Sequence, residues 1–323
     1  MILQFKIISL LVFFISGSLI SVAQRIDHIA SFETIDYEKY IRFYYDNDFF
    51  TKTDYYYTQG IVLEYGNPAL KNFILSKLLL NRGTDNRRYS IGVNLASYSP
   101  TSISSDDILY GDRPFAAIIS FSTNSLTTLK EKTQRLSSSV TIGVIGPAAQ
   151  GKEIQTGIHQ WLKNIMPHGW QYQLKNDVII NYSASYEKKL PLGGDHFLLN
   201  ATAAASIGTF TDKLSAGFNF MAGNFNDPYD LKPKRKKIQY YLYGQARTNI
   251  IGYDATLQGG LFTHNNPYTI ASADITRVTL QADAGVVINF RKTWLSYSQS
   301  FLTKEFKPGR YHRWGGISLG VAF

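Results

Sequence analysis

Apolar and polar residues alternate one by one along most of the chain after residue 40. The clearest stretches of this kind are 89–96, 278–286 and 317–323, the last of which ends on Phe323. Successive side chains of a β-strand point to opposite faces of the sheet, so a period of two predicts strands with one apolar face and one polar face.

This alternation predicts twelve strands in a single domain, since no linker or tandem repeat interrupts them. They begin near Tyr40, Tyr57, Arg88, Phe115, Thr133, Gln171, His196, Ser215, Ile238, Arg277, Thr293 and Tyr311. Apolar-out, polar-in alternation and an even strand number are typical of bacterial outer-membrane barrels. The sequence therefore predicts an all-β fold: a twelve-stranded antiparallel transmembrane β-barrel with a short extracellular helix.

Two segments depart from the alternation. Between residues 152 and 166, apolar residues recur at helical spacing, and Pro167 and Gly169 follow, which predicts a short amphipathic helix from Lys152 to Met166. A second helix is possible from Ala69 to Leu80, between the second and third strands.

The first residues predict export. Lys6 is followed by an apolar run, and Ser21-Val22-Ala23 precedes Gln24, which is the pattern of a cleaved signal peptide covering residues 1–23. The barrel domain would then cover residues 24–323. No later window has the roughly 20 consecutive apolar residues that a transmembrane helix needs. The chain has no cysteine, which excludes disulfides and thiol chemistry.

Composition supports a membrane barrel over a soluble protein. Tyr and Phe are abundant, with 22 and 20 residues, although mean hydropathy is only −0.14. Aromatic girdles around a wall with a polar lumen explain both features. The net charge of +9 suits anionic glycolipid in the outer leaflet better than nucleic acid, which an exported protein does not meet. The basic run from Lys232 to Lys237 is interpreted as a solvated periplasmic turn; with a strand count that differs by one, it would instead face the phosphates of the outer-leaflet glycolipid.

Strand parity gathers the polar residues on one rim. If the N-terminus lies in the periplasm, the connections after strands one, three and five are extracellular. The first contains Asn47, Asp48 and Thr58, the second contains Arg113, and the third carries the predicted helix. A site on this rim would face the outer leaflet or the medium.

The residue types on this rim suggest ester hydrolysis. Gln155 and His159 are four residues apart, so they share one face of the helix. Asn47, Asp48 and Thr58 offer oxygen ligands of the kind that calcium accepts. A neutral imidazole could take a proton from water while the cation stabilises an oxyanion. A serine triad is less supported, because no Gly-x-Ser-x-Gly elbow is present. The alternative is that these residues form solvated loops and turns.

At these positions the chain resembles the outer-membrane lipid A 3'-O-deacylases, which are calcium-dependent barrels. The resemblance spans about 130 residues in separate blocks. These are Asn47-Asp48, Tyr57 to Gly60, Asp112 to Ala116, Ile145 to Ala149 with Gln155 and His159, Gly169-Trp170, and Gln173-Leu174. The C-terminal half matches only at Gly223-Asn224 and Lys304 to Phe306.

The resemblance implies roles for individual residues. His159 looks like the general base, and Asn47, Asp48, Thr58 and Gln155 look like residues that bind or orient calcium and its water. Arg113 would hold a substrate phosphate or the barrel rim. One departure is that family members can have an acidic helper just beyond the histidine, whereas 160–166 contains no carboxylate.

These lines lead to a first hypothesis, a monomeric lipid A deacylase of the cell outer membrane. Its partners would be lipopolysaccharide of the outer leaflet and, through the terminal Phe323, the barrel-insertion machinery. The alternatives are a non-catalytic barrel, either a narrow pore or a structural protein, and an outer-membrane phospholipase.

Overall fold

The computed structural model describes residues 37–51, 55–81, 87–129, 133–230 and 236–323. The predicted signal peptide, Met1 to Ala23, lies outside the described residues, as do Lys232 to Arg235 of the basic run. Twelve strands form one sheet: β1 (Tyr40–Asn47), β2 (Tyr56–Gly66), β3 (Arg87–Ser99), β4 (Ala116–Leu129), β5 (Gln134–Ile145), β6 (Asp177–Gly194), β7 (Phe197–Gly208), β8 (Thr211–Asn224), β9 (Ile238–Asp254), β10 (Val278–Phe290), β11 (Thr293–Leu302) and β12 (His312–Ala322).

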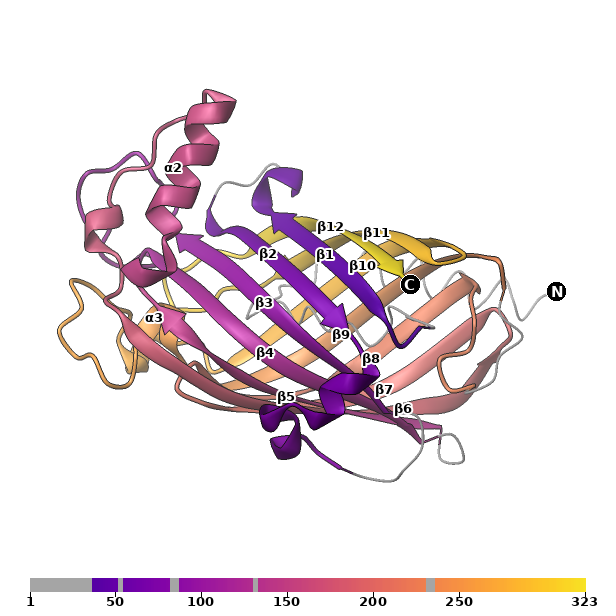
Figure 1. Ribbon diagram of the computed structural model, residues 1–323. Coiled ribbons are helices and arrows are strands. Elements are labelled where there is room, and N and C mark those ends of the chain that lie inside the picture. The colour runs from indigo at the N-terminus through magenta and orange to yellow at the C-terminus, as the bar shows by residue number, and fades with distance from the viewer. Residues whose placement is uncertain (1–36, 52–54, 82–86, 130–132, 231–235) are drawn as a thin grey trace.

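The sheet closes into a barrel because the first and last strands pair. All neighbouring strands are antiparallel, and β1 pairs with β12 from Tyr40 opposite Ala322 to Asn47 opposite Gly315. Closure removes the free edges whose backbone groups would be costly in lipid. The prediction of a twelve-stranded antiparallel barrel is confirmed (Figure 1).

The two ends of the barrel differ in their connections. At the end with the C-terminus, β6–β7 and β10–β11 are joined by two-residue turns. The opposite end carries the long connections from β3 to β4, β5 to β6 and β9 to β10. Short periplasmic turns and long extracellular loops are the rule in bacterial barrels, so this opposite end is the extracellular one.

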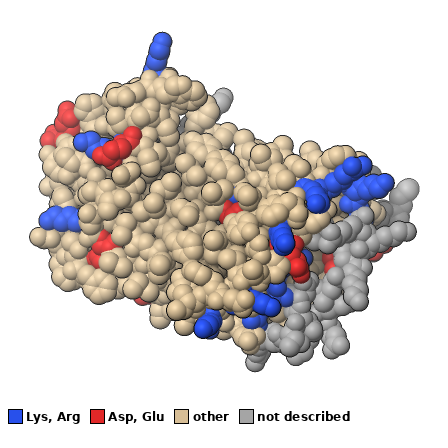
Figure 2. Space-filling model, viewed as in Figure 1, with Lys and Arg blue, Asp and Glu red and all other residues tan. Residues whose placement is uncertain are grey.

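Side chains of alternating residues line the lumen and the exterior. Arg42, Glu64, Asn94 and Ser120 line a lumenal cavity of about 180 Å³. The residues between them face outward, and many are exposed and apolar, including Phe43, Leu63, Val93 and Ile119. In Figure 2 the middle of this face is largely free of charged side chains, which gather toward the two ends. This is the polarity that a lipid-facing wall needs.

Helices are short and lie in the connections. Helix α2 (Gly151–Leu162) confirms the helix predicted between β5 and β6, although it ends at Leu162 because Lys163 adopts a left-handed conformation. Helix α3 (Ala255–Gln258) follows β9. No helix among the described residues combines the length and the hydropathy needed to cross a membrane.

The second predicted helix, Ala69 to Leu80, was wrong. The segment forms two 3-10 turns, η2 (Pro68–Asn72) and η3 (Ile74–Leu78), separated by Phe73 in an extended conformation. The Phe73 ring packs edge-on against Phe121 of the outer wall, with their centroids 6.0 Å apart. A contact with the wall therefore outweighs the local preference for a continuous helix.

Most predicted strand starts lie close to the observed ones, but two differ more. The sixth strand begins at Asp177 rather than Gln171, because Trp170–Tyr172 form a 3-10 turn, η6, packed beside α2. The eighth begins at Thr211 rather than Ser215. The boundary of the sixth strand is therefore set by a contact that alternation does not reveal.

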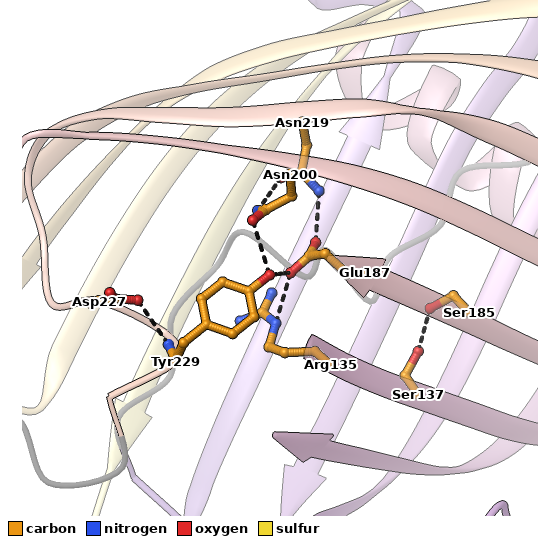
Figure 3. Close-up of polar contacts among 8 residues, drawn as sticks. All are labelled: Arg135, Ser137, Ser185, Glu187, Asn200, Asn219, Asp227 and Tyr229. Carbon is orange, nitrogen blue, oxygen red and sulfur yellow. Dashed lines mark hydrogen bonds and ion pairs between the residues drawn. The ribbon is translucent and has the colours of Figure 1, made fainter. Parts of the chain in front are cut away.

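The periplasmic connection between β8 and β9 folds back into the lumen, where Tyr229 is buried (Figure 3). Its hydroxyl lies 2.8 Å from Glu187 Oε1 and 2.9 Å from Asn200 Oδ1. Glu187 also accepts hydrogen bonds from Arg135 Nε at 2.8 Å and from Asn219 Nδ2 at 2.7 Å. This buried network joins four strands to the connection and narrows the lumen from the periplasmic side.

We expect Tyr229→Ala to raise ion conductance across planar bilayers, because truncation removes the ring that fills this part of the lumen. The wild type should show no large, steady conductance. Tyr240→Ala, at an exposed position on the adjacent strand β9, is the matched control and should behave like the wild type. Equal conductance of the wild type and Tyr229→Ala would contradict closure by this connection.

Candidate active site

Four strands bring separate parts of the sequence to one level of the extracellular rim. Asn47 of β1 lies opposite Gln59, Gln59 opposite Ser97, and Ser97 opposite Ala117 of β4. Directly paired residues share a face of the sheet. This rim row, defined as Asn47, Gln59, Ser97 and Ala117, therefore faces outward.

The rim row is covered, unlike the wall below it. Leu63, four residues further along β2 on the same face, is 51% exposed, whereas Gln59 is 5% exposed. Ser97 and Ala117 are also buried. An outward-facing position that is buried must lie beneath another part of the chain, so the site lies between the barrel wall and a covering element.

Thr58 occupies an irregularity in β2. The β2–β3 register shifts between Tyr57 and Gln59, so Thr58 is an extra residue in its strand. Its hydroxyl lies 2.9 Å from the Ser99 hydroxyl and is buried. Bulges of this kind redirect side chains and occur beside active sites. Here the bulge turns Thr58 to the side of Ser99, which follows Ser97 by two residues on β3.

Asn47 and Asp48 end β1 and begin the 3-10 turn η1 (Asp48–Thr51). Asn47 Oδ1 accepts a hydrogen bond from the Phe49 backbone N–H at 2.7 Å, and its amide donates to the Tyr45 hydroxyl at 3.1 Å. Asp48 is buried although it belongs to the rim. The Phe49 backbone N–H and the Tyr45 hydroxyl therefore fix the Asn47 side chain.

Helix α2 rests on this wall through its first turn. A Cβ on Gly151 would meet the Ala117 side chain at 2.4 Å and Trp170 at 2.8 Å, so only glycine permits this approach. Ala117 and Trp170 belong to a buried cluster outside the barrel with Ile103, Phe115 and Ala149. This cluster holds the base of α2 over β4 (Figure 1).

The buried face of α2 carries the two predicted catalytic residues. Gly151, Gln155 and His159 are its buried positions, one turn apart. Trp170 donates from Nε1 to Gln155 Oε1 at 2.7 Å. That bond fixes the amide orientation, because an indole N–H can only donate. Gln155 Nε2 is buried and has no hydrogen-bond partner among the described residues.

The tautomer of His159 follows from its partner. Its Nδ1 lies 2.5 Å from the backbone carbonyl oxygen of Ile165. A carbonyl oxygen only accepts hydrogen bonds, so Nδ1 carries the proton and Nε2 of the neutral ring is the basic nitrogen. This carbonyl supplies the orienting acceptor that the carboxylate-free segment 160–166 otherwise lacks.

The structure thus brings the predicted residues to one rim in two groups. Asn47, Asp48 and Thr58 lie on adjoining strands, whereas Gln155 and His159 lie on α2 above β4. Neighbouring strands are about 4.8 Å apart, so Ala117 lies roughly 10 Å from Gln59 and roughly 15 Å from Asn47. Among the described residues no three His, Cys, Asp or Glu side chains are placed to share a metal ion. The predicted calcium ligands include only one such side chain, Asp48.

Arg113 has a different environment. It is buried, forms an ion pair with Glu305, and donates to Thr256 Oγ1 at 2.5 Å. Its guanidinium also lies over the Tyr98 ring, 4.4 Å from the centroid. Burial raises the pKa of the Glu305 carboxyl to about 7, and the charge of Arg113 opposes that shift. These contacts tie three extracellular connections together, which favours the rim-holding role; phosphate binding stays a prediction.

The comparisons with known proteins agree with this architecture. Residues 7–323 match the family model described as outer membrane protein LpxR. The chain belongs to this family. The resemblance stated from the sequence is therefore confirmed, and the protein is an outer-membrane protein. None of the curated proteins matches the chain.

A solved structure of LpxR shares the fold. LpxR from Salmonella typhimurium has a TM-score of 0.70 at 20% identity, covering 88% of this chain and all, 100%, of that chain. The β domain of the Bordetella autotransporter BrkA has a TM-score of 0.46 at 8% identity, covering 88% of this chain and 98% of that one. The NanC porin has a TM-score of 0.39 at 5% identity, with the same two coverages, 88% and 98%.

Sequence reasoning missed the backbone carbonyl of Ile165 and the hydroxyl of Ser99. Neither has a sequence signal, because one is a backbone atom and the other depends on the bulge at Thr58. Trp170 was noted only within a block of the family resemblance. The hint in the sequence was a glycine followed by an aromatic residue, Gly169-Trp170. In the structure Gly169 has a φ of 83°, and the turn that it begins packs against the helix.

Removing the Arg113 charge should destabilise the barrel. We expect Arg113→Met to lower the free energy of unfolding by about 3–5 kcal/mol, because Glu305 would stay buried without its partner. The double variant Arg113→Met with Glu305→Leu should recover most of that loss. Urea unfolding in lipid vesicles measures both, with exposed Arg310→Met as control. Unchanged stability with a raised KM for a phosphorylated lipid would instead support phosphate binding.

Proposed function

We propose that this protein is a lipid A deacylase of the outer leaflet. It would hydrolyse an ester-linked acyl chain of lipopolysaccharide, with His159 as the base and calcium as the cofactor. Membership of the LpxR family supports the substrate class. The observation that carries the proposal is the orientation of His159: a buried imidazole on the wall-facing side of α2, with Nε2 as its basic nitrogen.

The candidate site lies on the outer surface of the barrel wall, and this position favours a lipid as the substrate. The rim row faces outward rather than into the lumen, directly above exposed apolar residues such as Leu63 and Ile119. A lipid held in the outer leaflet can reach such a site sideways without leaving the membrane. A soluble substrate would gain nothing from this position.

The reaction needs one proton to move twice. His159 Nε2 takes a proton from water as the water oxygen attacks the ester carbonyl carbon. The tetrahedral intermediate collapses, the bond to the sugar oxygen breaks, and the imidazolium returns the proton to that oxygen. The products are a carboxylic acid and an alcohol. The Ile165 carbonyl accepts from Nδ1 throughout and stabilises the imidazolium.

Gln155 fits the oxyanion of this reaction. Its Oε1 is held by Trp170, so Nε2 is the end that remains to act on the substrate. An N–H donor aimed at the developing negative charge lowers the barrier, and losing one such donor typically costs on the order of 10²–10³ in kcat. A donor nitrogen cannot bind a cation, so Gln155 would orient an oxygen rather than ligate calcium.

The residues at the end of β1 fit a weakly held calcium ion. Asp48 offers a buried carboxylate, Thr58 a buried hydroxyl, and Asn47 Oδ1 keeps a second lone pair beyond its bond to Phe49. All are hard oxygen donors, but only one is charged, and low ligand charge gives low calcium affinity. When bound, calcium supplies positive charge that polarises the ester carbonyl and favours the oxyanion.

The side chains that fill the lumen argue against a pore. Ion pairs of Arg42 with Glu64 and of Arg135 with Glu187 lie on lumen-facing positions. A phospholipase using the same chemistry is the second candidate. The substrate analysis below separates the two.

We expect His159→Ala to insert into the outer membrane normally and to lose deacylation by about 10²–10⁴-fold, because it lacks the base. Mass spectrometry of lipid A from a deacylase-free host measures this, and the same lipid extract reports phospholipid hydrolysis. His168→Ala is the matched control, since His168 lies in the same connection but is half exposed and bonded to Asp106. Full activity of His159→Ala would remove His159 from the mechanism.

Chelation should stop turnover reversibly. We expect excess EDTA to abolish activity and added calcium to restore it. Asp48→Asn should raise the calcium concentration for half-maximal activity by about tenfold or more, since the set loses its one negative charge. Asp106→Asn, at an exposed position, should not change it. Activity that persists in excess EDTA would exclude the calcium role.

A further inference from the structure

The C-terminal end of helix α2 exposes large apolar residues, although two polar residues of the helix are buried. Its buried positions include Gln155 and His159, whereas Trp161 is 81% exposed and Leu162 57% exposed. Ile165, just beyond the helix, is 61% exposed. Helices on a soluble surface show the opposite arrangement. We refer to Trp161, Leu162 and Ile165 as the apolar tip.

The position of the apolar tip indicates what covers it. Only the base of α2 packs against the wall cluster, and the helix then projects beyond the outline of the barrel at the extracellular rim (Figure 1). Outward-facing Ile119 and Ile142 are exposed on the strands directly below this base. The apolar tip therefore extends the lipid-facing surface of the barrel sideways.

The charge pattern at the tip also fits a membrane interface. Lys163 is exposed between Leu162 and the turn that leads to Ile165. A tryptophan with a neighbouring lysine is typical of segments that lie at the boundary of acyl chains and head groups. The lysine stem can follow the apolar surface while its ammonium group reaches the phosphates of an anionic lipid.

We propose that the apolar tip inserts among the acyl chains of the outer leaflet and thereby holds His159 in its reactive orientation. This proposal rests on the proposed function and adds a membrane-contact requirement to it. The occupant of the tip is hydrocarbon of the leaflet, not a protein partner.

The coupling runs through two residues. The Asn164 backbone N–H donates to the His159 carbonyl at 2.9 Å, and Asn164 Oδ1 accepts from the Ile165 N–H at 2.8 Å. The Ile165 carbonyl then accepts from His159 Nδ1. The Ile165 side chain is thus exposed at the surface, while its backbone oxygen accepts a hydrogen bond from the His159 ring. It is a positioning residue: lipid contact on one side restrains the oxygen on the other.

Insertion of the apolar tip can be measured by fluorescence, without an assay of enzymatic activity. Trp161 is the exposed tryptophan, whereas Trp170, Trp294 and Trp314 are buried. In vesicles of phosphatidylcholine with brominated acyl chains, we expect wild-type fluorescence to be quenched relative to unbrominated vesicles. The quenched part should disappear in Trp161→Phe. Equal quenching in wild type and Trp161→Phe would overturn insertion of the tip.

The functional consequence is tested with two substrates. In the double variant Trp161→Ser with Leu162→Ser, we expect hydrolysis of lipopolysaccharide in membranes to fall roughly tenfold or more, since burial of two large side chains is lost. The fall should appear in kcat as well as in KM, because the inserted tip both anchors the protein beside its substrate and holds His159 in its reactive orientation. Hydrolysis of a short-chain, water-soluble ester by detergent-solubilised protein should stay within about twofold of wild type, because neither protein then has a leaflet into which the tip can insert. Exposed Gln160→Ser is the matched control.

The outcomes separate this proposal from the proposed function. If the double variant deacylates membrane lipopolysaccharide at the wild-type rate, the role of the tip is wrong and the deacylase assignment stands. If the wild type deacylates nothing while His159→Ala behaves identically, the deacylase assignment fails. Quenching of Trp161 would then still report insertion, but the coupling to catalysis would be overturned.

Discussion

The structure depends on the need to satisfy every backbone N–H and C=O group within a lipid environment. A sheet meets that need only when it is closed, because an open edge would leave a row of unpaired groups in hydrocarbon. Pairing of β1 with β12 closes this one. The register of each strand pair decides which residues share a level. Asn47, Gln59, Ser97 and Ala117 lie in one outward-facing row because they are paired in turn across four strands.

Closure also places polar side chains on the lumen face of each strand and apolar side chains on its outer face. The lumen face carries the buried pairs of Arg42 with Glu64 and Arg135 with Glu187, which make the wall stiff at the cost of desolvating charge. The outer face is apolar until it reaches the rim, where the first turn of α2 and its cluster cover Ala117 of β4. A stiff wall is a useful support, because a base and an oxyanion donor must keep their positions to within a fraction of an ångström.

Alternation was sufficient to predict the barrel, because its period of two is imposed along whole strands by lipid on one side and a polar lumen on the other. Starts such as Tyr40, Ile238 and Thr293 agree with the structure. The predictions failed where a single tertiary contact decides the local backbone. Phe73 leaves the helical conformation beside Phe121, and η6 forms where Trp170 bonds Gln155. The sequence placed Thr58 and His159 on one rim, but the bulge and the Ile165 carbonyl that orient them are backbone features without a residue signature.

The exposure of Trp161 and Leu162 and the burial of Gln155 and His159 follow from the same physical constraint as the wall. A helix beside a membrane has lipid on one side and protein on the other, so its apolar residues belong outside and its polar residues can face inward. Gln155 and His159 can be buried on the protein side because Trp170 and the Ile165 carbonyl satisfy their fixed ends. Their other ends, Nε2 in each case, are the ones that remain for a substrate. A lipid that enters between the wall and α2 would meet both nitrogens without first crossing water.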